Sequence, residues 1–178
     1  MEYPWYIIIE SSDELLQGDF IPECPIVIPP SSIQIDDSPE VEIKLIDSIV
    51  LSQSCDLQNN HLEIVLVCPY YPLKSFLNML PSDQASTSKA INKTIDSLRK
   101  GFLPGYHLLE KHDIYLKDYQ VVDFRNVYGI HIDTLKTMSR SINQRIRLLP
   151  PYREHLSQSF ARYFMRVGLP QDIVVEGY

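Results

Sequence analysis

The sequence predicts an α+β fold: a bent antiparallel sheet or small β-barrel with inserted helices and a packed aromatic C-terminal helix. Short apolar runs of strand length, separated by turn residues, occupy much of the N-terminal part. Helical periodicity interrupts these runs at about 72–101, and an aromatic stripe of helical spacing follows Pro151. Because 178 residues can build one sizeable core and no segment resembles a linker, we expect a single domain over 1–178.

The N-terminal segment alternates between strand and turn signals. A β-branched run at 6–10 predicts the first strand, and Ser12 is placed to cap a one-turn helix that Gly18 would end. The run at 24–28 predicts a second strand, in which a proline indicates an edge position or a bulge.

The next runs form the centre of the predicted sheet. Alternation of apolar and charged residues at 40–45 predicts a half-buried strand. The wholly apolar run at 49–51 enters a polar cluster, which is typical of a buried strand that ends at the edge of a core. A turn signal precedes the largely apolar run at 62–71, so we expect this run to return as the antiparallel hairpin partner.

Helices and weaker strands fill the remainder. The insertion at about 72–101 contains a short helix and an amphipathic helix, which is the most basic stretch of the chain. We interpret the basic side of this helix as a solvated face, and a binding patch is the less favoured alternative. The later signals predict weak strands at 106–109 and 114–119, a stronger strand at 120–128, a helical turn at 133–138 and a short strand at 142–148.

The C-terminal helix is the clearest predicted element. Pro151 fits its first turn, and Gly168 and Pro170 stop it. The stripe consists of Tyr152, Leu156, Phe160, Tyr163, Phe164 and Val167. Because its rings can bury a large apolar area, we expect this helix to close the core of the sheet.

Composition limits the function classes. A net charge of −7 disfavours broad binding to nucleic acids or anionic membranes, so nucleic acid is not favoured as a partner. A protein partner is expected because no complete catalytic constellation is present. The three cysteines have no C-x-x-C spacing, so we predict no disulfide framework, structural metal or cofactor. The start lacks a signal-peptide pattern and no apolar run could cross a bilayer, so a cytoplasmic protein without membrane contact is expected.

Two segments of the chain resemble an uncharacterised bacterial protein family. One is Gly18-Asp19 leading to Val50-Leu51-Ser52-Gln53-Ser54-Cys55-Asp56, and the other is 147–154 leading to Phe164-Met165-Arg166-Val167-Gly168-Leu169-Pro170. That family has no established activity, so the resemblance brings no mechanism. It implies an accessory subunit of a bacterial multi-protein system, with phage defence or toxin–antitoxin as the context.

A remoter resemblance is to the MazF/PemK toxin barrels, small SH3-like folds that cleave RNA without a metal. Gly18-Asp19 and Val50-Leu51-Ser52 match short features of that family. Asp47-Ser48 replaces the arginine-proline that usually opens the second motif, and the region between Met1 and Lys44 contains no arginine. The resemblance therefore implies an SH3-like barrel more than it implies a ribonuclease.

The polar cluster after the central strand supplies candidate catalytic residues. Cys55 could act as a nucleophile if a histidine reached it, with a buried structural thiol as the alternative. Ser52, Ser54 and Asp56 stand beside it, and Arg125 could bind a phosphate.

Carboxylates and arginines elsewhere supply candidate binding residues. Asp19, Asp56 and Asp123 could converge on Mg²⁺, although carboxylates at strand ends more often bond to backbone amides. Arg125 follows Asp123 by two, so a structural ion pair on one strand face is the simpler interpretation. Positive charge also gathers near the C-terminus, at Arg145, Arg147, Arg153, Arg162 and Arg166, and could bind a nucleotide or RNA backbone near the two serines.

Three functions follow from these residues. We predict first a non-catalytic binding or accessory module, because no complete catalytic constellation is present. The second hypothesis is a metal-independent endoribonuclease that uses Ser52, Ser54 and either Arg125 or Arg147. The third is a Mg²⁺-dependent hydrolase on the aspartates at 19, 56 and 123.

Overall fold

The computed structural model describes residues 3–32, 41–59 and 61–165, and it confirms the α+β class. The strands are β1 (Tyr6–Glu10), β2 (Phe20–Ile28), β3 (Glu42–Val50), β4 (Ile64–Pro72), β5 (Tyr106–Leu109), β6 (Gln120–Asp123), β7 (Tyr128–His131) and β8 (Gln144–Leu148). The helices are α1 (Ser54–Gln58), α2 (Leu73–Met79), α3 (Ser82–Ala85), α4 (Ser88–Arg99), α5 (Ile132–Ser141) and α6 (Tyr152–Phe164).

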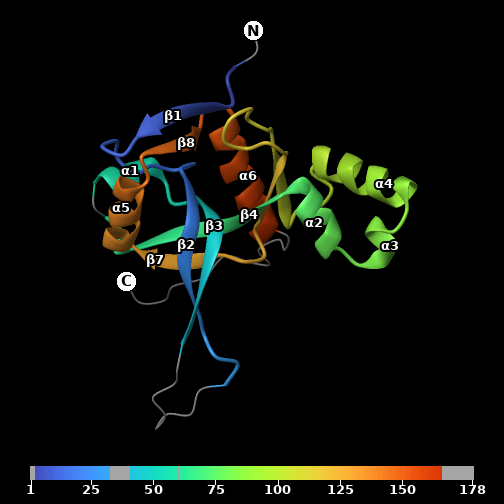
Figure 1. The fold of residues 1–178 in the computed structure, drawn as a ribbon, viewed down its shortest axis with the longest axis horizontal. Coiled ribbons are helices and arrows are strands. Elements are labelled where there is room, and N and C mark those ends of the chain that lie inside the picture. The colour runs from blue at the N-terminus through green and yellow to red at the C-terminus, as the bar shows by residue number, and fades with distance from the viewer. Residues whose placement is uncertain (1–2, 33–40, 60, 166–178) are drawn as a thin grey trace, which may run out of the picture.

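The strands pair antiparallel throughout the described part of the chain (Figure 1). The larger sheet has the order β2-β3-β4-β6-β5, with β7 also paired to β4, and β1 pairs with β8 in a second sheet. The two sheets meet where Leu148 donates its backbone N–H to the Gly18 carbonyl at 2.9 Å. They form no closed barrel within residues 3–32, 41–59 and 61–165, so the bent-sheet alternative is correct and the barrel alternative is wrong.

The central run is a buried strand end, as predicted. Ile49 and Val50 are both fully buried at the end of β3. Successive strand residues point to opposite faces, and these two side chains enter separate apolar clusters. The sheet is therefore covered on both faces at this point.

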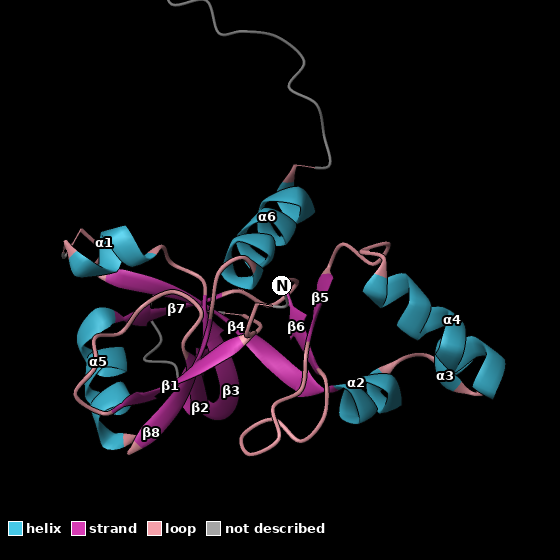
Figure 2. Ribbon diagram, turned by 90° about the horizontal axis from the view of Figure 1, so that it is seen from above, coloured by secondary structure: helices cyan, strands magenta, loops and turns pink. Residues whose placement is uncertain are grey.

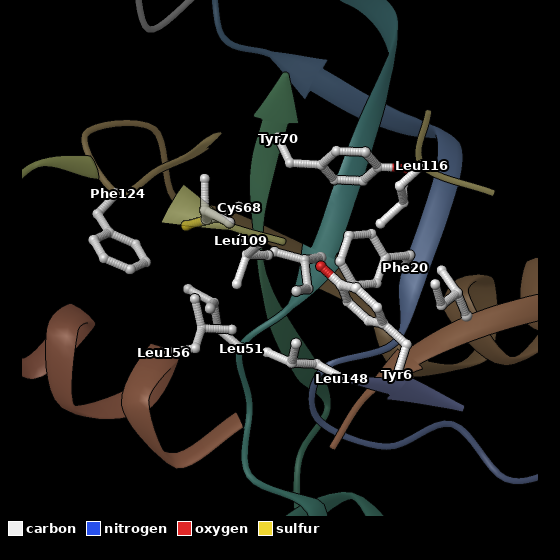
Figure 3. Close-up of a cluster of buried hydrophobic side chains, with 13 residues drawn as sticks. Tyr6, Phe20, Leu51, Cys68, Tyr70, Leu109, Leu116, Phe124, Leu148 and Leu156 are labelled. Atoms are coloured by element: carbon white, nitrogen blue, oxygen red, sulfur yellow. The ribbon is translucent and has the colours of Figure 1, made fainter. Parts of the chain in front are cut away.

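The first apolar cluster lies under α6 (Figure 3). Phe20 contacts Tyr70 edge to face, with ring centroids 4.9 Å apart, and Tyr6 at 5.8 Å. Leu156 enters this cluster from α6 and is fully buried. The predicted contact between the aromatic helix and the sheet is confirmed.

Only part of the predicted stripe on α6 is buried. Tyr152, Phe160 and Tyr163 pack against the first cluster while staying partly accessible. Phe164 is 62% exposed, and Val167 lies outside the described residues. The helix thus contacts the core along its length as far as Tyr163.

The inserted helices α2, α3 and α4 lie together beside the sheet, between β4 and β5 in the chain (Figure 2). Leu73 and Phe76 of α2 and Leu98 of α4 pack against Val121 of β6. This third apolar cluster attaches the insertion to the sheet. No helix in the described ranges is long and apolar enough to span a bilayer.

The predicted one-turn helix after Ser12 is wrong, because the segment 11–18 consists of turns, a bend and irregular backbone. Its backbone groups serve other elements: Gly18 donates to the Val50 carbonyl at 2.9 Å, and the carbonyls of Asp13 and Glu14 accept from Arg145. Tertiary hydrogen bonds therefore replace helical ones. Conversely, α1 (Ser54–Gln58) forms where only a polar cluster was predicted.

Two strand predictions in the second half need correction. The segment 114–119 forms no strand, only an isolated bridge between His112 and Leu116. The segment 120–128 is divided into β6 and β7 by a turn at Asp123, whose carboxylate accepts the backbone N–H of Arg125 at 3.0 Å. A side-chain cap of this kind favours a turn over a continuous strand.

Most of the predicted strand at 40–45 and of the buried run at 49–51 belongs to one continuous strand, β3, and the predicted burial of the first part is wrong. Val41, Ile43 and Leu45 are 54%, 60% and 65% exposed. Ile43 and Leu45 of β3 pair with Val27 and Pro25 of β2 in a hairpin that extends beyond the body of the sheet (Figure 1). The proline-containing β2 lies at the edge of the larger sheet and carries a register shift between Ile21 and Cys24, so both predicted consequences of its prolines are found.

Gly18 and Gly101 offer a matched test of the crossing between the two sheets. Both have positive φ, +83° and +69°, so alanine costs about 1–2 kcal/mol at either position. A Cβ at Gly18 would also lie 3.0 Å from the Leu148 Cβ, whereas nothing lies within 4 Å at Gly101. We expect Gly18→Ala to lower the free energy of unfolding, measured in urea, by roughly 1 kcal/mol more than Gly101→Ala. Equal losses would contradict the tight crossing.

Candidate functional site

The serines after β3 have structural hydrogen bonds. The Ser52 Oγ accepts the backbone N–H of Leu66 at 2.9 Å, which joins the end of β3 to β4. The Ser54 Oγ accepts the backbone N–H of Gln17 at 3.3 Å. Both hydroxyls therefore hold the chain where β3 ends, rather than facing a common ligand.

Cys55 is exposed, so its interpretation as a buried thiol is wrong. Helix α1 turns its side chain outward, 3.9 Å from the Gln53 Oε1 and 3.8 Å from the Asp56 Oδ1. Neither contact supplies a base of the kind a cysteine nucleophile requires. The buried thiols are those of Cys24 and Cys68, and burial raises the pKa of Cys24 to about 11.

Asp19 lies at the centre of a buried ion-pair network. Its side chain is fully buried at the start of β2, beside the crossing of the two sheets. The carboxylate binds the Arg145 Nε at 3.0 Å and the Arg147 guanidinium through both oxygens. It also accepts the backbone N–H of Leu16 at 3.2 Å. Because both oxygens of the Asp19 carboxylate already accept hydrogen bonds from these donors, they are poorly placed to coordinate a metal ion.

Arg145 is almost completely buried, at 2% exposure. Its five N–H donors are matched by Asp19 and four backbone carbonyls, those of Glu10, Asp13, Glu14 and Ser139. A buried charge is tolerated when it is paired and its hydrogen bonds are satisfied. This guanidinium therefore stabilises the turn segment before β2 and has no donor left for a phosphate.

Asp123 and Arg125 form the predicted ion pair, but within a turn instead of on a strand face. The carboxylate binds the Arg125 Nε and Nη2 and the Asn126 Nδ2, each at 3.0 Å. The Arg125 guanidinium stays largely accessible and lies 4.5 Å from the centre of the Tyr106 ring. The pair fixes the β6–β7 turn.

The other predicted charges do not gather into one site. Within residues 3–32, 41–59 and 61–165, no group of three or more His, Cys, Asp or Glu could hold a metal, so Asp19, Asp56 and Asp123 form no such cluster. Arg153 pairs with Glu154 at 2.8 Å, and Arg166 lies outside the described residues. Among the other predicted C-terminal arginines, Arg145 and Arg147 are bound to Asp19.

The structure contains a cleft that the sequence did not predict, although one of its residues, Arg162, was among the candidate binding arginines. The cleft has a volume of about 820 Å³ and lies between α4, β5 and α6. Figure 2 shows these three elements around the same side of the molecule. Its cations come from both helices: Arg99 and Lys100 at the end of α4, and Arg162 on α6. The basic character of the first helix was visible in the sequence, but its position opposite the second was not.

The histidines of the cleft differ in environment. His107, on β5, lies near the Phe124 ring, and burial lowers its pKa to about 4. It is therefore neutral at pH 7. His155, on α6, is exposed and lines the same cleft. The neutral imidazole offers hydrogen bonding without charge at the cleft wall.

The comparisons with known proteins add no identity. A scan of the chain against family models finds no match, and a search of curated proteins also finds none. The structure defines the class: an α+β protein with a bent antiparallel sheet, a buried Asp–Arg network and a partly basic cleft.

Proposed function

We propose that this protein is a non-catalytic binding module of a bacterial multi-protein system, and that it docks on another protein through one face of the β2–β3 hairpin. We call this surface the hairpin face. It consists of Pro25, Val27, Val41, Ile43 and Leu45. Its uncovered apolar side chains are the observation that carries the proposal.

The strand register places these side chains together. Val27 pairs with Ile43, and Pro25 pairs with Leu45. Paired residues of an antiparallel ladder share a face, and alternate residues of one strand do too. Val27, Val41, Ile43 and Leu45 are each more than half exposed, so the hairpin face is a continuous apolar strip.

The opposite face of the hairpin is covered at Ile26, whereas Lys44 and Glu42 on that face are exposed. Ile26 is 1% exposed and packs in the second apolar cluster, against which Met138 of α5 also packs. The hairpin is thus held to the body on one side and open on the other. Clustered exposed apolar residues are typical of interaction surfaces, because covering them recovers about 25 cal/mol per Å².

Charges beside the hairpin face indicate the chemistry of the partner. Asp47 follows Leu45 by two and accepts the backbone N–H of Glu23 at 3.0 Å. The side-chain carboxylates of Asp47 and Glu23 have no ion pair with a described residue. With a net charge of −7, this surface suits a partner whose apolar face is bordered by lysine or arginine.

The engagement of the predicted reactive groups supports a non-catalytic role. The two serines hold backbone amides, and Arg147 is occupied by Asp19. Arg125 is likewise bound to Asp123. The ribonuclease and hydrolase hypotheses therefore gain no support from these side chains.

Site-specific crosslinking tests the docking proposal. We expect a photo-crosslinking residue at position 43 to capture one other protein in cells, whereas the same residue at position 44 captures much less. Lys44 is the matched control because it is adjacent, exposed and on the opposite strand face. The captured protein is then purified and its affinity for this chain measured directly.

In that reconstituted complex, Ile43→Glu should weaken binding by at least about 30-fold, as for a central interface residue. Lys44→Gln should change the affinity less than threefold or so. Equal capture at both positions, capture of only a second copy of this chain, or no capture would overturn the proposal.

A further inference from the structure

The cleft between α4, β5 and α6 has positive walls in an acidic protein. Among its lining residues, Arg99, Lys100 and Arg162 oppose a single carboxylate, Glu110. The whole chain carries a net charge of −7. A local excess of cations against that balance favours a negatively charged ligand.

Two of these cations are free to bind it. Lys100 pairs with Asp96 at 2.6 Å, one helical turn earlier. Arg99 and Arg162 have no hydrogen bond or ion pair with any residue of 3–32, 41–59 and 61–165. They come from two different helices and line the same cleft. Guanidinium groups bind phosphate oxygens bidentately.

The same cleft has apolar and aromatic lining. Leu98 and Leu109 are almost fully buried beneath it, and Ile95 adds a partly buried side chain. Trp5 and Tyr119 supply rings to the lining. An aromatic ligand group can therefore pack on these residues while its charge faces the arginines.

Uncharged polar groups complete the site. The neutral His107 imidazole has no side-chain hydrogen bond among the described residues, and Gln158 and Ser159 of α6 line the same space. Groups of this kind recognise the edge of a heteroaromatic base or a ribose. A volume of about 820 Å³ falls in the range of small-molecule sites.

We infer that this cleft binds a free mononucleotide, with its phosphate between Arg99 and Arg162 and its base on the apolar lining. The site is separate from the hairpin face and does not depend on the docking proposal. An acidic chain with one small basic cleft suits a free nucleotide, because a nucleic-acid backbone needs an extended basic surface.

Calorimetric titration of the full chain tests this inference with three probes. AMP should bind with half-saturation below about 1 mM. Adenosine lacks the phosphate and inorganic phosphate lacks the base, so each should bind at least tenfold more weakly than AMP. Raising the salt concentration should weaken AMP binding, because the arginines are accessible to solvent.

Variants then locate the site. Arg99→Ala and Arg162→Ala should each weaken AMP binding about tenfold or more, through loss of charge-assisted hydrogen bonds. Lys93→Ala, also on α4 but outside the cleft lining, is the matched control and should bind as the parent does. Arg99→Gln and Arg162→Gln repeat the test with longer neutral side chains, and unfolding temperatures verify that each variant is folded.

Four results would overturn the inference: no AMP binding, equal binding of phosphate alone, equal binding of adenosine alone, or unchanged affinity in both arginine variants. Ile43→Glu should leave AMP binding intact, and Arg162→Ala should leave crosslinking at position 43 intact. The two proposals can therefore fail independently.

Discussion

Replacing Asp19 with alanine should destabilise the protein by about 3–5 kcal/mol, because it leaves a charged guanidinium buried without its counter-ion. Arg145 is 2% exposed and cannot reach water without disrupting the turn segment whose carbonyls it binds. Arg147 would lose the same partner. The free energy of unfolding from urea titration measures the effect.

Asp113→Ala is the matched control, since this aspartate is exposed and has no described partner. It should change the stability by less than about 0.5 kcal/mol. If both variants lost the same small amount, the Asp19 network would not contribute to stability as described.

Leu156→Ala should cost about 2–5 kcal/mol, because it leaves a cavity where α6 meets the sheet. Leu156 is fully buried in the first apolar cluster, whereas the rings of α6 are partly accessible. It is therefore the main anchor of this helix. Urea unfolding of the variant measures the loss, and near-UV circular dichroism reports the packing of the surrounding rings.

Two controls separate packing from helix propensity. Leu156→Met preserves the volume and should cost less than about 1.5 kcal/mol. Phe164→Ala removes a larger side chain from the same helix at a position 62% exposed, and should cost much less than Leu156→Ala. A greater loss at position 164 would contradict the described packing of α6.

Much of the fold was predictable because the spacing of apolar residues along the sequence reflects which side of a helix or strand is buried. Alternation and apolar runs located β1, parts of β2 and β3, and β4, and the helical stripe located α6. The same reasoning failed at 11–18, where Ser12 can cap a helix but Arg145 binds the carbonyls instead. No local pattern reports a hydrogen bond to a residue that is distant in the sequence.

The candidate site was less predictable. The sequence singled out serines and aspartates as reactive groups, but the same residue types also accept hydrogen bonds from backbone N–H groups and neutralise buried charges. Asp19, Asp123 and Ser52 have these structural roles here. From the sequence, Arg99 belongs to a solvated helix face, and Arg162 is a candidate to bind an anion near the two serines instead of opposite Arg99. Only their common position on one cleft distinguishes them.

By itself, the sequence determined the α+β class, the buried run at 49–50 and the apolar side of the C-terminal helix, because each depends on residues close together in the chain. The tertiary structure decided which charges neutralise one another, which apolar face stays open and where a cleft lies. These properties depend on contacts between distant segments, so the chain must fold before they exist.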